Sequence, residues 1–138
     1  MPNNRLRVAI VGGGIGGLSV ANALVRRGLD VTLFEQVDTL REIGTGLSLF
    51  PNGRRQLERM GLKDALAQVG AKVGEVSVCR MDGSLVGPMP TTDSSGWNGV
   101  YGMHRADLSQ TLADALPPTV IRTAIAALGS NRMFAQRS

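Results

Sequence analysis

The sequence has few of the residues on which disulfides, metal centres and thiol chemistry depend. Its 138 residues include one cysteine, Cys79, and one histidine, His104. A single cysteine excludes a disulfide within the chain and weakly favours a reducing, cytoplasmic setting. One histidine and one cysteine are also too few for a metal constellation. Because "EVSVCRMDG" alternates like a strand, we expect Cys79 to be a small buried thiol rather than a nucleophile.

Aromatic residues and lysines are also scarce. Aromatic residues make up 4% of the chain, and since only Lys63 and Lys72 are lysines, the net charge of +4 comes almost entirely from arginine. The arginines stand singly or in pairs, with acids between many of them and no aromatic residues interleaved. Nucleic-acid binding requires a clustered basic face. The pattern therefore favours a solvated arginine surface and no nucleic-acid partner.

One long uncharged segment raises the question of a membrane. In "RVAIVGGGIGGLSVANALVRRG", 18 residues without a charged side chain separate Arg7 from Arg26. That length is enough to span a bilayer, and the arginines ahead of the segment imitate a secretory signal. Five glycines between Gly12 and Gly17 would, however, break a membrane helix or a signal sequence near its start. We therefore expect no membrane segment.

The internal order of this segment predicts a strand, a glycine turn and a helix. Residues 7–11 form a β-branched run that suits a buried parallel strand. Ser19, Asn22 and Arg26 are expected on the polar side of the helix, and Gly28 is expected to end it. Apolar residues recur at helical spacing on the other side, at Ile15, Leu18, Ala21, Leu24 and Val25.

Gly12, Gly14 and Gly17 fit the pattern G-x-G-x-x-G of dinucleotide-binding turns. In such a turn the first glycine permits the tight bend, the second lets the backbone approach a pyrophosphate, and the third lets the helix pack closely on the sheet. The helix N-terminus offers free N–H groups to the anion. The second predicted strand, "DVTLFE", ends in Glu35, 23 positions after Gly12 and near the spacing expected for an acid that binds the adenosine ribose. Since a carboxylate repels a 2′-phosphate, FAD or NAD is favoured over NADP.

The rest of the chain predicts short elements and no internal repeat. "NGRRQLERM" reads as a helix with Asn52 as a possible N-cap and Gly61 as its stop, and "LKDALAQVG" as a second helix ending at Gly70. "GEVSVCRMDGSLVGPMP" predicts a hairpin around "MDGS", and "TTDSSGWNG" a polar loop. "HRADLSQTLADALPP" predicts a helix with an apolar stripe, followed by a strand at "TVIR". The stripe consists of Leu108, Leu112 and Leu116.

Three segments in this order resemble the start of the single-component FAD-dependent aromatic hydroxylases of the salicylate-hydroxylase kind. They are "VAIVGGGIGGLSVANALVRRGLDVTLFEQ", "LREIGTGLSLFPNGRRQLERMGL" and "YGMHRADLSQTLADAL". The resemblance implies an α/β fold: a Rossmann-like βαβ dinucleotide-binding core with an inserted β-hairpin, incomplete relative to the family. It also implies FAD as cofactor, NAD(P)H as reductant and monooxygenase chemistry on a small aromatic substrate.

The resemblance also assigns roles to individual residues. By it, the glycine turn, including Ile15, would wrap the FAD pyrophosphate, and Glu35 would hold the ribose. Arg41 matches an arginine near the cofactor's ribose and phosphate, Gly44 and Gly46 match a glycine loop near the flavin, and Arg105 in "HRADL" matches an arginine that contacts the FAD chain. No residue is assigned a catalytic role.

The family's later Asp-Gly and Gly-Asp motifs and its substrate-binding region have no counterpart in the sequence. We therefore expect residues 1–122 to form a partial FAD-binding domain and residues 123–138 to be a tail of uncertain structure, as a truncated gene or a frameshift would produce. A parallel sheet needs helices on both faces and strands on both sides of its first βαβ unit, and a chain that stops early leaves apolar surface uncovered. We therefore expect marginal stability, weak or absent FAD binding and no hydroxylation by this chain alone. Two alternatives stay open: a nucleotide-binding module completed by a partner chain, and an NAD-dependent dehydrogenase domain, against which the "HRADL" helix speaks.

Overall fold

The computed structural model describes residues 6–39, 45–74, 77–88 and 99–126. The chain divides into two compact units, each with its own sheet and core. The first unit comprises Met1–Glu42 and Ser109–Ser138, and the second comprises Ile43–Leu108.

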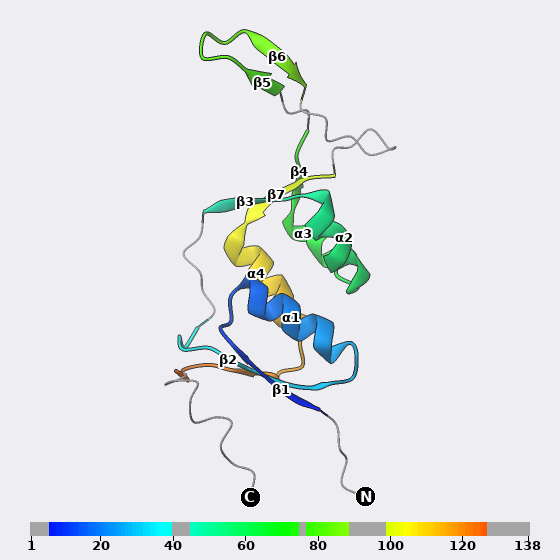
Figure 1. The fold of residues 1–138 in the computed structure, drawn as a ribbon, viewed down its shortest axis with the longest axis vertical. Coiled ribbons are helices and arrows are strands. Elements are labelled where there is room, and N and C mark those ends of the chain that lie inside the picture. The colour runs from blue at the N-terminus through cyan, green and yellow to red at the C-terminus, as the bar shows by residue number, and fades with distance from the viewer. Residues whose placement is uncertain (1–5, 40–44, 75–76, 89–98, 127–138) are drawn as a thin grey trace, which may run out of the picture. The chain divides into compact units, whose positions relative to one another are not determined.

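The first unit is built on a βαβ arrangement, drawn in blue and cyan in Figure 1. Strand β1 (Arg7–Val11) leads through helix α1 (Ile15–Val25) into strand β2 (Asp30–Phe34). The two strands pair in parallel along their whole length, and β8 (Ile121–Arg122) pairs in parallel with the other side of β2. The strand order β1-β2-β8 confirms the predicted Rossmann-like core and the predicted strand at "TVIR".

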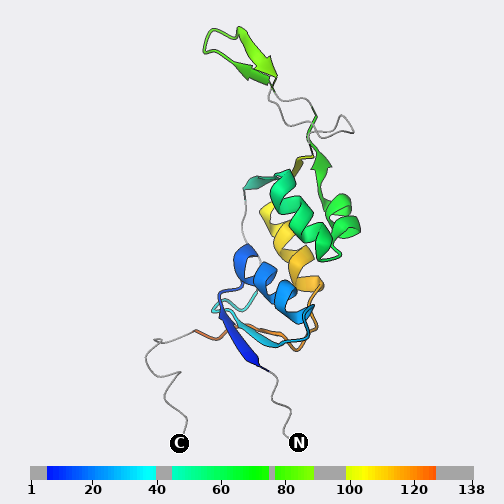
Figure 2. The same cartoon turned by 45° about the vertical axis from the view of Figure 1, so that its right-hand side comes forward.

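Helix α1 covers one face of this sheet, as Figures 1 and 2 both show. Val31 and Leu33 of β2 are buried, at 5% and 0% exposure. Arg7, Ala9 and Val11, whose side chains alternate with the half-buried positions of β1, are exposed. Parallel sheets normally carry helices on both faces. Among the described residues no helix covers the opposite face, so the part of that face formed by β1 is bare.

Among the described residues, no helix is long and apolar enough to cross a membrane. The uncharged segment of the sequence is divided instead into β1, the glycine turn and α1. Gly28 follows the helix with a φ of +76° and donates its N–H to the Val25 carbonyl at 2.9 Å, which confirms it as the stop.

The prediction that Asn22 lies on a polar side of α1 is wrong. Asn22 is 2% exposed, and its Nδ2 donates to the carbonyl oxygens of Leu18 at 2.9 Å and Leu112 at 2.8 Å. Leu112 belongs to α4 (Arg105–Asp114), so the amide links two helices. A helix packed against a sheet and also against a second helix buries more than one stripe of its surface, and a single-stripe pattern misses this.

The second unit holds a small antiparallel sheet of order β3-β7-β4 together with two helices. Gly46 pairs with His104 and Leu49 with Tyr101 in the register of its two longer strands. The buried side chains of this unit include Leu57, Leu62 and Leu66 from the helical region and Tyr101 and Met103 from the sheet. The elements are β3 (Gly46–Leu49), α2 (Pro51–Arg59), α3 (Lys63–Val69), β4 (Ala71–Lys72) and β7 (Tyr101–His104).

Most helix boundaries agree with the sequence, but the start of α2 does not. The helix begins at Pro51 with Phe50 as its N-cap, so the prediction of Asn52 as N-cap is wrong. Proline has its φ fixed near the helical value and needs no hydrogen-bond partner for its nitrogen at the first helical position, so the helix starts two residues earlier than a cap at Asn52 would place it. Gly61 and Gly70 end α2 and α3 as predicted. Leu108 and Leu112 of the fourth helix and Leu116, two residues after its end, are buried as predicted.

Strands β5 (Ser77–Cys79) and β6 (Leu85–Pro88) form the predicted hairpin. Arg80 N–H donates to the Ser84 carbonyl at 2.8 Å, which closes the turn around "MDGS". The prediction of a buried Cys79 is wrong, because the thiol is exposed. An alternating pattern assumes that one face of a strand is covered, whereas every residue of β5 is exposed. Most of the predicted polar loop, with Trp97, lies outside the described residues.

Candidate functional site

The turn between β1 and α1 places backbone where side chains would not fit. Gly12 has a φ of +101°, a conformation that favours glycine, and its N–H donates to the Phe34 carbonyl at 2.8 Å. A Cβ on Gly17 would lie 1.9 Å from the carbonyl oxygen of Gly12. The first and third glycines of the motif are therefore required by the turn itself.

Helix α1 begins immediately after this turn without any side chain closing its end. Gly14 is the N-cap, has extended backbone angles and makes no side-chain capping bond. Its carbonyl accepts the N–H of Leu18 at 2.9 Å, which starts the helical hydrogen bonding. The first turn, which includes Ile15, contains no acidic residue. The partial positive charge of the helix start is thus not offset by a carboxylate of the helix's first turn.

The carboxylate of Glu35 reaches the glycine turn from the end of β2. Its Oε2 accepts the N–H of Gly13 at 2.5 Å, and its Oε1 accepts the N–H of Val37 at 3.0 Å. These two backbone hydrogen bonds, that of Val37 first, hold the pKa of Glu35 below its ordinary value, against a smaller opposing effect of burial. The side chain is ionised at neutral pH and joins two segments that are 22 positions apart.

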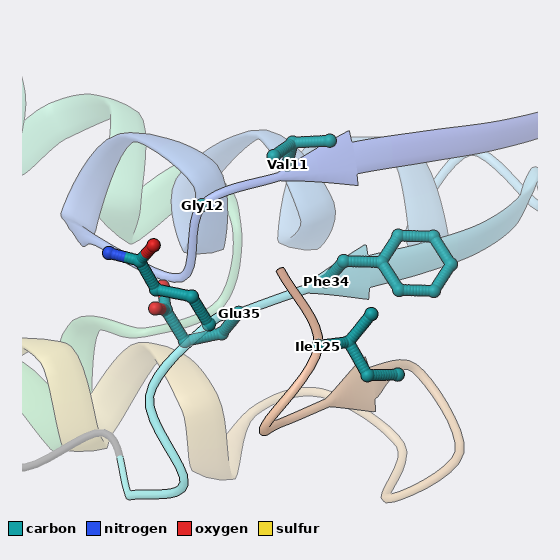
Figure 3. Close-up of a pocket in the computed structure, with 6 residues that line it drawn as sticks. Val11, Gly12, Phe34, Glu35 and Ile125 are labelled. Atoms are coloured by element: carbon teal, nitrogen blue, oxygen red, sulfur yellow. The ribbon is translucent and has the colours of Figure 1, made fainter. Parts of the chain in front are cut away.

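The glycine turn and the acid share one crevice, shown in Figure 3. Its volume is about 250 Å³, below the roughly 300–1,000 Å³ of complete ligand pockets, so it accommodates part of a dinucleotide rather than all of it. The crevice is at the carboxyl ends of parallel strands, where α/β sheets bind ligands. It is lined by Val11, Gly12, Phe34, Glu35, Gln36 and Ile125.

Two apolar residues that line the crevice, Phe34 and Ile125, were not found from the sequence. Ile125 belongs to the segment predicted to be a tail of uncertain structure, yet its N–H donates to the Glu35 carbonyl at 2.9 Å. Phe34 stands in Figure 3 on the same side as Ile125. No motif marks either residue, because their positions follow from the pairing of β8 with β2, whose partner is nearly 90 positions away in the chain.

The remaining predicted residues either are not described or belong to the second unit. Arg41 and Gly44 are outside the described residues. Gly46 and Arg105 belong to the second unit, where Gly46 pairs with His104 and Arg105 N–H donates to the Thr45 carbonyl at 3.3 Å. Gly46 and His104 line a separate open hollow of about 350 Å³ with Met103 and three other residues. Within the part of the chain that the structure describes, no cluster of three potential metal ligands occurs.

Comparison with known proteins places the chain beside flavin-dependent hydroxylases. A family model described as an NAD(P)-binding Rossmann-like domain matches residues 10–41. The chain is 37% identical to 3-amino-4-hydroxybenzoate 2-monooxygenase of Streptomyces platensis over 87% of its own length and 31% of the relative. It is 36% identical to 3-hydroxybenzoate 6-hydroxylase of Polaromonas naphthalenivorans over 83% of the chain and 30% of the relative.

Solved structures agree with these relatives. Over 88% of this chain and 32% of the other, the structure resembles 2-methyl-3-hydroxypyridine-5-carboxylic acid oxygenase, with a TM-score of 0.76 and 28% identity. A structure from Pseudomonas aeruginosa described as a probable FAD-dependent monooxygenase matches with a TM-score of 0.69 and 25% identity over 87% of this chain and 32% of the other. The resemblance to FAD-dependent aromatic hydroxylases is confirmed. The chain spans about a third of the length of these relatives.

Proposed function

We propose that this chain is the dinucleotide-binding portion of an NAD(P)H-dependent flavoprotein monooxygenase that hydroxylates a small aromatic substrate, and that its crevice takes the adenosine diphosphate half of FAD. The observation that carries the proposal is the placement of the Glu35 carboxylate within hydrogen-bond distance of Gly13. An acid and a side-chain-free turn in one crevice are the two parts that recognition of a ribose diphosphate needs.

The residues of the turn and the crevice fit different parts of such a cofactor. The backbone of Gly14 and the uncapped start of α1 would hold the pyrophosphate through N–H donors, and Gly12 presents no side chain that would obstruct it. Glu35 would accept hydrogen bonds from ribose hydroxyls. Phe34 and Ile125 give the crevice apolar walls suited to a base. Bound FAD would supply the redox and oxygen chemistry of the whole protein.

Further contacts are proposed from the family resemblance. Arg41 and Arg105 would contribute guanidinium donors to oxygen atoms of the cofactor, and Gly46 would allow close approach near the flavin. Reduction by NAD(P)H, a cytoplasmic location and an aromatic substrate are proposed for the complete protein. Because the chain spans about a third of its relatives, we expect it to bind FAD weakly and to hydroxylate nothing by itself.

A nicotinamide dinucleotide is the second candidate ligand. The family model that matches residues 10–41 is described by NAD(P) binding, and the same crevice geometry serves NAD. In this reading the chain is a dehydrogenase domain, or a binding module completed by a partner chain. Glu35 disfavours NADP in either reading, because its ionised carboxylate repels a 2′-phosphate.

Direct titration separates these candidates. The complete chain is titrated with FAD, NAD⁺ and NADP⁺ by calorimetry, and with FAD also by quenching of flavin fluorescence. We expect FAD to bind more tightly than NAD⁺, and NADP⁺ to bind least. Tighter binding of NAD⁺ than of FAD would support the dehydrogenase reading, and binding of none would contradict the proposal for this chain.

Two neighbouring glycines supply matched variants for the titration. Gly17→Ala places a methyl group against the Gly12 carbonyl and should abolish nucleotide binding. Gly16→Ala meets no atom within 4 Å and should leave binding unchanged or slightly improved, since alanine favours the helix. Equal affinities of the two variants would place the nucleotide away from this turn.

A further inference from the structure

The residues of the glycine turn have little conformational preference of their own. Three consecutive glycines, Gly12 to Gly14, lose more conformational freedom on folding than any other residue type would. A turn of this kind must be fixed by bonds from outside, or a nucleotide has to order it at a cost in affinity. The hydrogen bonds around the turn therefore decide whether the site exists before its ligand arrives.

In the part of the chain that the structure describes, both external hydrogen bonds to the turn come from the end of β2. The N–H of Gly12 donates to the Phe34 carbonyl, which continues the β1–β2 pairing by one residue. The N–H of Gly13 has the Glu35 carboxylate as its partner. The first bond is made by backbone and is independent of side-chain identity. The second depends on a single side chain.

The carboxylate is itself held in position for this bond. Its other oxygen accepts the N–H of Val37, and the Glu35 backbone is fixed by N–H donation to the Arg122 carbonyl at 2.8 Å. The two carboxylate oxygens together accept about four hydrogen bonds, so acceptor capacity remains for a ribose hydroxyl beside the backbone N–H groups. Holding the turn and binding a ribose are therefore compatible tasks for one side chain.

We propose that Glu35 is a positioning residue for the glycine turn: its carboxylate, oriented by Val37, holds Gly13 in the nucleotide-ready conformation while no nucleotide is bound. That this conformation serves nucleotide binding rests on the proposed function. The hydrogen bonds of Glu35 to Gly13 and Val37 are present without a nucleotide, so the positioning role can be tested without one.

Glu35→Gln discriminates this role from ribose binding alone. A glutamine has one acceptor oxygen and one donor nitrogen, so it satisfies either Gly13 or Val37 and turns an N–H group toward the other. Ribose hydroxyls both donate and accept, and they would tolerate the amide. Asp30→Asn is the matched control, because it neutralises an exposed acid at the far end of the same strand, where the Asp30 side chain forms a 3.6 Å ion pair with Arg7.

Amide hydrogen exchange of the nucleotide-free chain, followed residue by residue by NMR, measures the effect. In Glu35→Gln the Gly13 amide should exchange at least about tenfold faster than in the unsubstituted chain, because a hydrogen bond to a charged acceptor is lost. Leu33, whose N–H donates to the Val120 carbonyl at 2.8 Å, reports global unfolding and should accelerate by a smaller factor than Gly13, set only by the loss of overall stability. Asp30→Asn should alter neither amide.

Unchanged Gly13 exchange in Glu35→Gln would overturn the proposal. If the variant unfolds, so that Leu33 and Gly13 accelerate together, the unsubstituted chain decides the matter. A through-hydrogen-bond coupling between the Gly13 nitrogen and the Glu35 carboxylate carbon is expected, and its absence with rapid Gly13 exchange would contradict the role. None of these measurements uses FAD. A chain that binds no FAD can therefore still confirm the positioning role of Glu35, and a chain that binds FAD can still lack that role.

Discussion

At the scale of single residues, two polar side chains, Glu35 and Asn22, form hydrogen bonds with backbone groups. Glu35 accepts from two N–H groups, and Asn22 donates to two carbonyl oxygens. Both connect segments that lie far apart in the chain. Such contacts are worth more than exposed side-chain pairs, since buried or half-buried polar groups lose little to competing water. They fix the glycine turn and the helix that follows it.

The lowered pKa of Glu35 makes the stability of the chain depend on pH. Because the pKa in the folded chain is below its unfolded value, ionised Glu35 contributes stability that is present above the ordinary glutamic acid pKa. This contribution is lost as the pH falls through the lowered folded value. We expect the difference in denaturant midpoint between the unsubstituted chain and Glu35→Gln to be largest at neutral pH and to vanish in strong acid. A difference that is constant with pH would show that ionisation of Glu35 does not contribute.

Removing the buried Asn22 amide should lower the stability of the chain more than removing the exposed Gln110 amide. Asn22→Ala leaves the buried Leu112 carbonyl without its 2.8 Å donor and should destabilise the chain by about 1–3 kcal/mol in urea denaturation. Gln110→Ala removes an exposed bond to Asp114 within α4 and should cost about 0.2–0.5 kcal/mol. Equal losses for the two variants would mean that the buried amide makes no special contribution.

At the scale of elements, the sequence predicted those strands, turns and helices whose formation depends on residues close together in the chain. The first strand, the glycine turn and α1 follow from β-branched residues, glycines and helical spacing, all within 20 residues of one another. The pairing of β7 with both β3 and β4 was not predictable in this way, since partners such as Gly46 and His104 are chosen by packing across the chain. For the same reason, sequence reasoning found the acid and the turn but missed Ile125.

The buried stripe of α4 gives the clearest prediction at this scale. Leu112 is fully buried, and Leu112→Ala should cost about 2–5 kcal/mol, enough to abolish a cooperative unfolding transition in a marginally stable chain. Leu85 in the exposed hairpin is 62% exposed, and Leu85→Ala should change stability by less than about 0.5 kcal/mol. Thermal unfolding followed by circular dichroism compares them. A cooperative transition that survives in Leu112→Ala would contradict the assignment of this helix to the core.

At the scale of the whole molecule, the described parallel sheet has apolar side chains exposed on one face. In the described part of the first unit, the side of the sheet away from α1 presents Ala9 and Val11, and Ile125 is 43% exposed beside it. Strand β1 is also an edge strand in the described sheet, with β2 as its partner on one side. An open edge next to a bare apolar face favours association between chains.

We therefore expect the purified chain to self-associate with increasing concentration and to bind a hydrophobic dye such as ANS. Ala9→Lys places a charge in the middle of the bare face, away from the glycine turn, and should reduce both association and dye binding, as measured by light scattering on a sizing column and by fluorescence. Ala67→Lys adds the same charge at an exposed position of α3 and should change neither. If both lysines reduced association equally, net charge rather than the sheet face would be responsible, and the bare face would have to be covered by residues outside those described.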